Sequence, residues 1–506
     1  MDIPIRTGGL QGIEGVSVAV EVDLVRGLPA FHLVGLPTSA VRESRERVTA
    51  AIRNSGHRLP AGKVTVNLAP ADVPKEGTGH DLAIAVAVIL AERVRRGRAR
   101  RASGGFLVGE LSLFGEVRPV RGLLSIVLDA RARGERAVVV PASQVWEARL
   151  VPGLEVIGVS SLAQAVDWVL AGRRPAVDAP SGGARPAPPA PPLPIEQLAS
   201  QPHAARAALL AAAGGHHLLL VGPPGAGKTR LARLLGHLLP DLEEDEALQV
   251  TRIHGAAGLL HRPGLVRRPP VRAPHHTITA AGLLGGGGRP RPGEVTLAHA
   301  GVLFLDELSE FAARTLDALR EPLSEGVVHV ARGNGHRRFP ARFQLVAATN
   351  PCRCGYLGSR VRACVCRPGD LARHRGRLSG PLRDRFELVV DMGDGDRPDP
   401  GAGDRADDVR GRVARARAIV RRLQPPPAHW SLGRRVAAFG LDTAARDVLD
   451  QARRPLALSA RGLLRACAVA HTAAALDGDP VVRAHHVREA LQFRHEALGS
   501  MTAAEG

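Results

Sequence analysis

The segment 222–229 carries the residue types of a loop that binds phosphate. It reads Gly-Pro-Pro-Gly-Ala-Gly-Lys-Thr, fits the pattern G-x-x-x-x-G-K-T, and follows the apolar run Leu218–Val221. Helical spacing continues over residues 230–239. Glycines let backbone N–H groups turn toward phosphate oxygens, and the N-terminus of the following helix adds partial positive charge. The predicted nucleotide-binding residues are Gly222, Pro223, Pro224, Gly225, Ala226, Gly227, Lys228 and Thr229.

Acidic side chains at the end of a second strand would complete such a site. An apolar run ends directly before Asp306 and Glu307. In a site of this kind Lys228 reaches the β- and γ-phosphates of ATP, while the Thr229 hydroxyl and Asp306 hold Mg²⁺. Glu307 would polarise the attacking water as a general base. The alternative is that the acidic pair only caps a helix, which we expect from Leu308 onward.

A third apolar run, 343–349, ends at Asn350. The side-chain amide could orient the attacking water, the role called sensor 1. The alternative is an asparagine that only ends the strand before Pro351. With the first two strand ends, this one predicts an ATPase that requires ATP and Mg²⁺.

Four of the five cysteines fall close together, and the fifth, Cys467, stands apart in a helical segment. Stable disulfides are disfavoured in the cytoplasm, and four clustered thiols suit tetrahedral Zn²⁺. The C-x-C spacing is tighter than the usual C-x₂₋₄-C, so redox-sensitive thiols and cysteines without a ligand remain alternatives. The candidate zinc ligands are Cys352, Cys354, Cys364 and Cys366.

The phosphate loop and the strands that end in Leu-Asp-Glu and Ala-Thr-Asn resemble those of AAA+ ATPases. Four further segments narrow the resemblance: Arg-Ala-Pro-His-His-Thr (272–277), Pro-Gly-Glu-Val-Thr-Leu-Ala-His (292–299), Asn-Pro-Cys-Arg-Cys-Gly (350–355) and Leu-Ser-Gly-Pro-Leu-Arg-Asp-Arg (378–385). Together they resemble the magnesium-chelatase-like YifB/ComM family of bacteria, over nearly the whole chain. The resemblance implies a ring-forming ATPase, with DNA branch migration in natural transformation as the activity of the best-understood branch.

The same resemblance assigns two arginines. Arg385 would be an arginine finger that enters the site of a neighbouring subunit, where such a residue is worth about 10³ to 10⁵ in rate. Arg461 would be the sensor-2 residue and touch the γ-phosphate in its own chain. The alternative for Arg385 is a salt bridge to Asp384 or to another nearby acid. The alternative for Arg461 is an incidental residue in an arginine-rich chain. One departure is that the family's Gly-Gln pair before the nucleotide domain is represented only by Gln201, after a serine.

A net charge of +19 raises the question of nucleic-acid binding, but the basic residues are almost all arginine, which also fits a GC-rich genome. Aromatic residues make up 3 %, too few for an extended base-stacking surface, so DNA would be held through its phosphates. Apolar runs around Gly-Asn-Gly predict a hairpin over 327–339, in the place of the pre-sensor-1 hairpin of this clade. Arg332, Arg337 and Arg338 are the candidate DNA contacts, and a solvated hairpin is the alternative.

Residues 1–172 resemble the Lon-protease domain, so peptidase chemistry has to be considered. Lon-type enzymes use a serine activated by a lysine. Gly79 stands in the place of the serine, and Leu124 in the place of the lysine. We therefore expect no peptidase activity and interpret the domain as a platform for substrate or partners.

These residues require a particular set of elements to position them. The fold class expected is α/β: a P-loop AAA+ core with a helical lid, preceded by the Lon-like α/β domain. The predicted boundaries are 1–172 for the Lon-like domain, 173–194 for a Pro/Ala-rich linker, 195–400 for the ATPase core and 401–506 for the lid. No signal peptide or membrane span is evident, so we expect a cytoplasmic protein without membrane partners.

Three functions remain open at this point. The first is a homo-hexameric motor that acts on branched or single-stranded DNA as a helicase. The second is an ATPase that remodels proteins or inserts a metal, as magnesium chelatases do. The third is a scaffold that binds nucleotide without hydrolysis, against which the intact Asp306 and Glu307 argue. The sequence identifies no protein partner.

Overall fold

The computed structural model describes residues 5–36, 38, 41, 43–71, 74–97, 104–175, 201–260, 262–287, 291–332, 335–393, 406–423, 427 and 429–502. The chain forms two compact units. The N-terminal unit comprises Met1–Ala187, Glu244–Val266 and Gly288–Pro292, and the C-terminal unit comprises Pro188–Glu243, Arg267–Gly287 and Gly293–Gly506. Most of the predicted linker, residues 176–194, lies outside the described residues.

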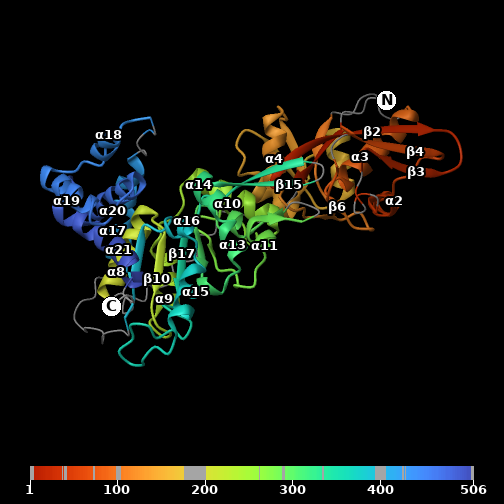
Figure 1. Cartoon of the computed structure of the whole chain (residues 1–506). Coiled ribbons are helices and arrows are strands. Elements are labelled where there is room, and N and C mark those ends of the chain that lie inside the picture. The colour runs from red at the N-terminus through yellow and green to blue at the C-terminus, as the bar shows by residue number, and fades with distance from the viewer. Residues whose placement is uncertain are drawn as a thin grey trace. The chain divides into compact units, whose positions relative to one another are not determined.

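The N-terminal unit contains a mixed seven-stranded sheet in the order β3-β4-β2-β1-β5-β8-β9 (Figure 1). Its long strands β1, β2 and β4 pair antiparallel, while β5, β8 and β9 continue the sheet in parallel. The strands of this unit are β1 (Ile5–Gln11), β2 (Glu14–Val25), β3 (Ala30–Val34), β4 (Lys63–Ala69), β5 (Gly105–Leu107), β6 (Glu110–Leu111), β7 (Val117–Arg118), β8 (Ala137–Pro141), β9 (Glu155–Val159) and β13 (Arg291–Pro292).

Helix α3 is the centre of this unit's core. It contains the longest apolar run of the chain, and every residue from Asp81 to Glu92 is buried. A helix that is apolar all round must be covered on every side, and α3 packs against β2, α2 and α6. The helices are α2 (Ser44–Asn54), α3 (Asp81–Arg95), α4 (Leu123–Ala132), α5 (Val145–Ala148), α6 (Leu162–Ala171), α10 (Glu244–Ala257) and the 3₁₀ turn η1 (Ala142–Gln144).

Helix α10 reaches the N-terminal unit from the middle of the nucleotide domain's sequence. The Gly122 amide donates to the Gly255 carbonyl at 3.1 Å. Arg252 donates to the Ser125 hydroxyl at 3.1 Å and forms an ion pair with Glu14. Residues 244–266 therefore belong to the N-terminal unit, although they lie within the predicted ATPase core, 195–400.

The C-terminal unit contains a parallel five-stranded sheet in the order β11-β14-β17-β10-β18. Its strands β10, β14 and β17 are the three runs whose ends carry the predicted site. Because all are parallel, their carboxyl ends share one edge, and β17 lies between the other two. The strands of this unit are β10 (Leu218–Val221), β11 (Val271–Arg272), β12 (Gly285–Gly286), β14 (Val302–Leu305), β15 (Val327–Arg332), β16 (Gly335–Pro340), β17 (Gln344–Thr349) and β18 (Leu388–Asp391).

One face of this sheet packs against helices. Leu218 and Leu220 join a buried cluster with residues of α8, α9 and the C-terminal helices, which lie together beside the sheet (Figure 1). The helices are α8 (Pro202–Gly214), α9 (Lys228–Leu238), α11 (Ala280–Leu284), α12 (Glu294–Leu297), α13 (Ala313–Asp317), α14 (Arg320–Glu325), α15 (Pro368–Gly376), α16 (Gly380–Arg383), α17 (Ala406–Arg422), α18 (Leu432–Ala437), α19 (Thr443–Arg453), α20 (Ala460–Asp477) and α21 (Ala484–Thr502).

The fold class expected from the sequence is confirmed, as is the hairpin, in which β15 pairs antiparallel with β16. The prediction of a helix that begins at Leu308 is wrong. Glu307 has a left-handed backbone, with φ of 52°, so the chain turns there and forms only the 3₁₀ turn η2 (Leu308–Glu310). Among the described residues, no helix is both long and apolar enough to cross a bilayer.

Candidate active site

The phosphate loop connects β10 directly to α9. Gly227, with φ of 87°, precedes the first helical residue, Lys228, in a left-handed conformation that favours glycine. A Cβ atom on Gly222 would lie 2.4 Å from the Met392 carbonyl oxygen, so a larger residue does not fit at the start of the loop. Residues 222–227 therefore form a tight turn that places their backbone N–H groups at the N-terminus of α9. Helix N-termini of this kind bind phosphates.

Lys228 is folded back over this loop. Its Nζ donates to the carbonyl oxygens of Gly222 at 2.7 Å and Pro223 at 2.8 Å, and to Asn350 Oδ1 at 3.0 Å. Burial lowers the pKa of Lys228, and the charge of Asp306 opposes this shift. A partly buried ammonium group at the helix N-terminus fits an anionic phosphate, which would stabilise the charge that burial disfavours.

The second strand end is joined to the loop through oxygen atoms. The Thr229 hydroxyl donates to Asp306 Oδ2 at 2.7 Å, and Asp306 Oδ1 accepts from the Glu307 amide at 3.0 Å. Hydroxyl and carboxylate oxygens are the ligands that Mg²⁺ prefers. The two predicted Mg²⁺ ligands thus lie together, and with Lys228 they fit a nucleotide bound through its metal and phosphates.

Glu307 is the most exposed acid of this site, with 60 % of its side chain accessible. Its Oε2 lies 3.5 Å from His276 Nδ1, and the His276 ring packs against His275. The segment that contains these histidines is one of those that carry the family resemblance, but its residue types alone indicate no role for either histidine. A signal existed, since they follow β11, the parallel neighbour of β14, so the ends of both strands meet at one edge.

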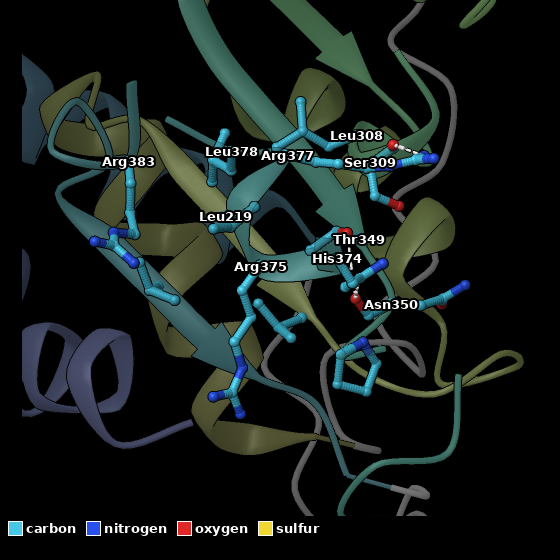
Figure 2. A pocket seen from close by; sticks show the side chains of 13 residues that line it. Leu219, Leu308, Ser309, Thr349, Asn350, His374, Arg375, Arg377, Leu378 and Arg383 are labelled. Carbon is cyan, nitrogen blue, oxygen red and sulfur yellow. Dashed lines mark hydrogen bonds between the residues drawn. The ribbon is translucent and has the colours of Figure 1, made fainter. Parts of the chain in front are cut away.

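A small cavity of about 70 Å³, partly open to solvent, lies beside Asn350 on the other face of the sheet. Figure 2 shows its lining, in which Leu219 of β10 and Thr349 of β17 lie near side chains of the α15 region. His374 Nε2 lies 2.9 Å from the carbonyl oxygen of Asn350, the residue that follows β17. No residue of 222–229 lines this cavity, so it adjoins the phosphate loop without being part of it.

Gln201 contacts the phosphate loop directly. Its side-chain Nε2 donates to the Ala226 carbonyl at 3.0 Å. This residue is what remains of the Gly-Gln pair discussed above. Because Gln201 directly precedes α8, this hydrogen bond connects the start of α8 to the phosphate loop.

The two arginines assigned by resemblance lie in one group, which we call the arginine cluster: Arg385, Arg461 and Arg465. Burial lowers the pKa of Arg385, and the charges of Arg465 and Arg461 lower it further. Arg385 donates to the Ser324 hydroxyl at 2.6 Å and forms no ion pair with Asp384 among the described residues. Within the same described part of the chain, no hydrogen bond or ion pair links Arg385 or Arg461 to the phosphate loop or Asp306. Their roles in trans and in cis stay predictions.

The hairpin separates its arginines. Arg337 pairs with Val330 and Arg338 with His329 in adjacent positions of β16, and adjacent residues of a strand point to opposite faces. Arg338 is exposed and Arg337 is half-buried, so the two do not line one surface together. The side chain of Arg332 lies outside the described residues. Contact with DNA stays a prediction.

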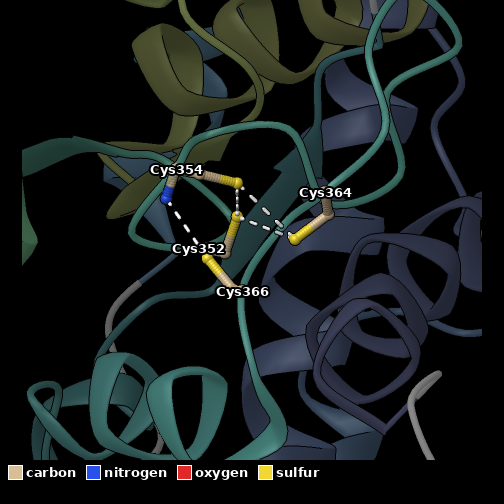
Figure 3. Close-up of side chains that lie close together, drawn as sticks. All are labelled: Cys352, Cys354, Cys364 and Cys366. Atoms are coloured by element: carbon tan, nitrogen blue, oxygen red, sulfur yellow. Dashed lines mark hydrogen bonds between the residues drawn. The ribbon is translucent and has the colours of Figure 1, made fainter.

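The four clustered cysteines converge (Figure 3). Cys352 Sγ lies 3.4 Å from Cys354 Sγ and 3.7 Å from Cys364 Sγ, and Cys354 Sγ lies 3.6 Å from Cys364 Sγ. A ZnS₄ tetrahedron with bonds of about 2.3 Å has edges of about 3.8 Å. All four Sγ atoms lie within 4.8 Å of one another, so the donor set fits zinc in number, chemistry and spacing. The Cys354 amide also donates to Cys366 Sγ, as amides around bound thiolates do.

The N-terminal unit shows no comparable site at the Lon-type positions. A Cβ atom on Gly79 would contact Val120 and Val108 at 3.4 and 3.5 Å, and Leu124 is fully buried in the apolar core. Lys75 is also buried, and its Nζ donates to the Pro70 carbonyl. The absence of peptidase activity stays a prediction.

The sheet, the phosphate loop and the linked acidic strand end define a P-loop ATPase of the AAA+ type. Family descriptions match all three parts of the chain: "Subunit ChlI of Mg-chelatase" at residues 20–144, "Magnesium chelatase, subunit ChlI" at 194–398, and "Magnesium chelatase, subunit ChlI C-terminal" at 403–494. The chain belongs to the magnesium chelatase ChlI family, in the branch of the full-length relatives YifB and ComM. Membership implies ATPase activity with ATP and Mg²⁺, and proteins with such a domain often oligomerise.

Three relatives illustrate the similarity. The chain is 38 % identical to YifB of Escherichia coli, over 97 % of this chain and 96 % of that protein. It is 36 % identical to the competence protein ComM of Haemophilus influenzae, over 96 % and 95 %. A Lon protease of Lachnoclostridium phytofermentans is 24 % identical over 170 residues, which cover 31 % of this chain and 20 % of that enzyme.

Proposed function

We propose that this protein is a ring-shaped motor that hydrolyses ATP to move branched DNA, as a branch-migration helicase. The observation that carries the enzymatic part is the hydrogen-bonded link between three strand ends. Thr229 bonds to Asp306, and Lys228 bonds to Asn350, so the groups for metal, phosphate and water binding are within reach of one another.

Each group has a defined task in this proposal. Lys228 would exchange its two loop carbonyls for phosphate oxygens, and Thr229 and Asp306 would hold Mg²⁺. The metal would act as a Lewis acid that neutralises charge on the phosphates. Glu307 would accept the proton of the attacking water, which Asn350 would orient. Glu307 suits this task because its carboxylate is exposed beside the loop and tied only loosely to His276.

The arginine cluster supports the proposed ring. Arg385 has no hydrogen bond or ion pair with the phosphate loop among the described residues, so an arginine finger needs the site of a second subunit. We therefore propose a homo-oligomer, a hexamer by family resemblance, with Arg385 acting in trans. Arg461 is proposed as sensor 2 in its own chain.

DNA is the proposed track because the relative ComM is a competence protein and because the chain carries a net charge of +19. The exposed Arg338 on the hairpin is the leading candidate contact, with Arg332 and Arg337 beside it in the sequence. We place this activity in the cytoplasm. A second candidate, metal insertion or protein remodelling, is favoured by the match to the chelatase subunit.

We also propose that the four cysteines hold one structural Zn²⁺. The support is the spacing of their sulfur atoms, which matches a tetrahedral site. Thiolates would be its only ligands, which is the composition of a closed, structural zinc site. Metal analysis of protein purified without chelators should find about one zinc ion per chain. Finding none would remove this proposal.

ATP turnover in the presence of DNA tests the proposed function. Four-way or single-stranded DNA should raise the rate of phosphate release by the full chain, whereas candidate protein substrates should not. Glu307→Gln should lower turnover by about 10²- to 10⁴-fold while ATP still binds, because only the proton acceptor is lost. An ATP turnover rate that does not change when DNA is added would favour the second candidate, metal insertion or protein remodelling. Unchanged turnover in Glu307→Gln would overturn the assignment of Glu307 as the general base.

A further inference from the structure

The four-cysteine loop, residues 352–366, begins two residues after Asn350. Cys352 is fully buried, so the start of the loop is fixed in the protein. Asn350 itself is held at two points, by Lys228 at its side chain and by His374 at its carbonyl oxygen. Cys352 is separated from the proposed water-binding residue only by Pro351 in the sequence, so a movement of Cys352 would shift Asn350 as well.

The same loop presses against the phosphate loop. Gly355, with φ of 87°, faces Pro224, and a Cβ atom there would lie 2.7 Å from Pro224 Cδ and 2.9 Å from Cγ. That Cβ would also lie 3.9 Å from Asn350 Cγ. Only a glycine allows this close approach, so the turn between Cys354 and Gly355 supports both the outer side of the phosphate loop and Asn350.

We infer that the metal-bound four-cysteine loop positions the phosphate loop and Asn350 for ATP hydrolysis, with Gly355 as the point of contact. This inference rests on the proposed function and on the proposed zinc site. Four thiolates on one ion would fix both ends of the loop, because Cys352 and Cys354 are at its start and Cys364 and Cys366 at its end. Without the ion the contact with Pro224 loosens, and a misplacement of about 1 Å near the reacting groups can cost about 10²-fold in rate.

Two glycines of the loop provide a matched test. Gly355 and Gly358 both have left-handed backbones, with φ of 87° and 80°, but a Cβ atom on Gly358 meets nothing within 4 Å. Gly355→Ala should lower kcat by about tenfold or more while zinc remains bound. Gly358→Ala carries the same backbone strain and should stay within about twofold of the unchanged protein. Equal kcat values in the two variants would overturn the role of the contact with Pro224.

A second arm uses the unchanged full chain and needs no variant to fold. Zinc is removed with a chelator under reducing conditions and then added back, while zinc content, nucleotide affinity and turnover are measured. We expect kcat to fall with the zinc content and to recover on addition, with a smaller change in affinity. Cys467→Ala, the control cysteine outside the loop, should keep its zinc and respond in the same way.

The outcomes distinguish a failure of the proposed ATPase function from a failure of the proposed role of the four-cysteine loop. A chain that hydrolyses no ATP before any treatment contradicts the proposed function itself. A chain that hydrolyses ATP but binds no zinc, or keeps its turnover after losing zinc, overturns this inference and leaves the ATPase standing.

Discussion

The two units share a fold class but differ in what their charged groups contact. In the C-terminal unit, polar side chains at parallel strand ends bond to one another across strands and remain accessible, as the pair Thr229–Asp306 does. In the N-terminal unit, Asp81 is fully buried and paired with Arg47 at 2.7 Å, and Leu124 lies in the core. In this protein the candidate site forms where polar groups near the strand ends bond to one another and stay accessible to a ligand, whereas the polar groups of the N-terminal sheet are enclosed in its core.

The half-buried Lys228 and the fully buried Lys75 give the clearest expected contrast between the two units. Lys228→Met should lower ATP turnover by at least about 10²-fold, because it removes the cation that would stabilise phosphate charge. Lys75→Met should leave turnover unchanged and lower the free energy of unfolding by about 1–3 kcal/mol, because the hydrogen bond from the charged Lys75 Nζ to the Pro70 carbonyl is lost. Turnover and chemical unfolding of both variants check this. A similar loss of turnover in both would show that the distinction between the units is wrong.

A second contrast lies within the C-terminal unit, between the phosphate loop and the arginine cluster. Arg385→Ala should lower turnover by about 10³-fold or more, as loss of an arginine finger does. Mixing inactive Arg385→Ala with inactive Lys228→Met should restore part of the turnover, because some interfaces then pair an intact loop with an intact finger. Mixtures without any recovery, in rings shown to exchange subunits, would place Arg385 outside the neighbouring site.

A further comparison of the two units concerns pH rather than turnover. Burial lowers the pKa of His216 in one unit and of His80 in the other to about 4, from 6.5. Between these values the unfolded chain takes up protons that the folded chain does not, so this stability is complete above pH ~6.5 and is lost as the pH falls toward ~4. The loss amounts to about 3 kcal/mol for each histidine.

Unfolding free energies measured from pH 7 to pH 4 check this, with glutamine as the neutral replacement. His216→Gln keeps a partner for the Thr472 hydroxyl, which now lies 2.8 Å from the His216 ring. Each single variant should lower the slope by a similar amount, and the double variant should lower it by the sum of the two. The slope that remains belongs to other histidines, such as His217, whose pKa is also lowered by burial. An unchanged slope in His216→Gln would show that this histidine is protonated in the folded protein.

The site's framework was predictable because its signals are local. The turn glycines, Lys228 and the acidic pair follow apolar runs whose ends must share an edge once the strands are parallel. Backbone turns and contacts between segments far apart in the sequence have no such local pattern and could not be predicted in this way. The left-handed backbone of Glu307 prevents the helix that was expected to begin at Leu308. Residues 244–257 pack within the N-terminal unit through contacts such as that of Gly255 with Gly122. The pairing register of the hairpin, which separates Arg337 from Arg338, depends on strand geometry rather than on residue type.

We propose that ATP turnover at the linked strand ends drives movement of DNA. The decisive experiment is branch migration of a synthetic four-way junction by the full chain with ATP and Mg²⁺. We expect the unchanged protein to separate the junction and Glu307→Gln not to separate it, although both bind ATP. Junction movement that continues in Glu307→Gln, or an unchanged protein that turns over ATP without moving the junction, would contradict it.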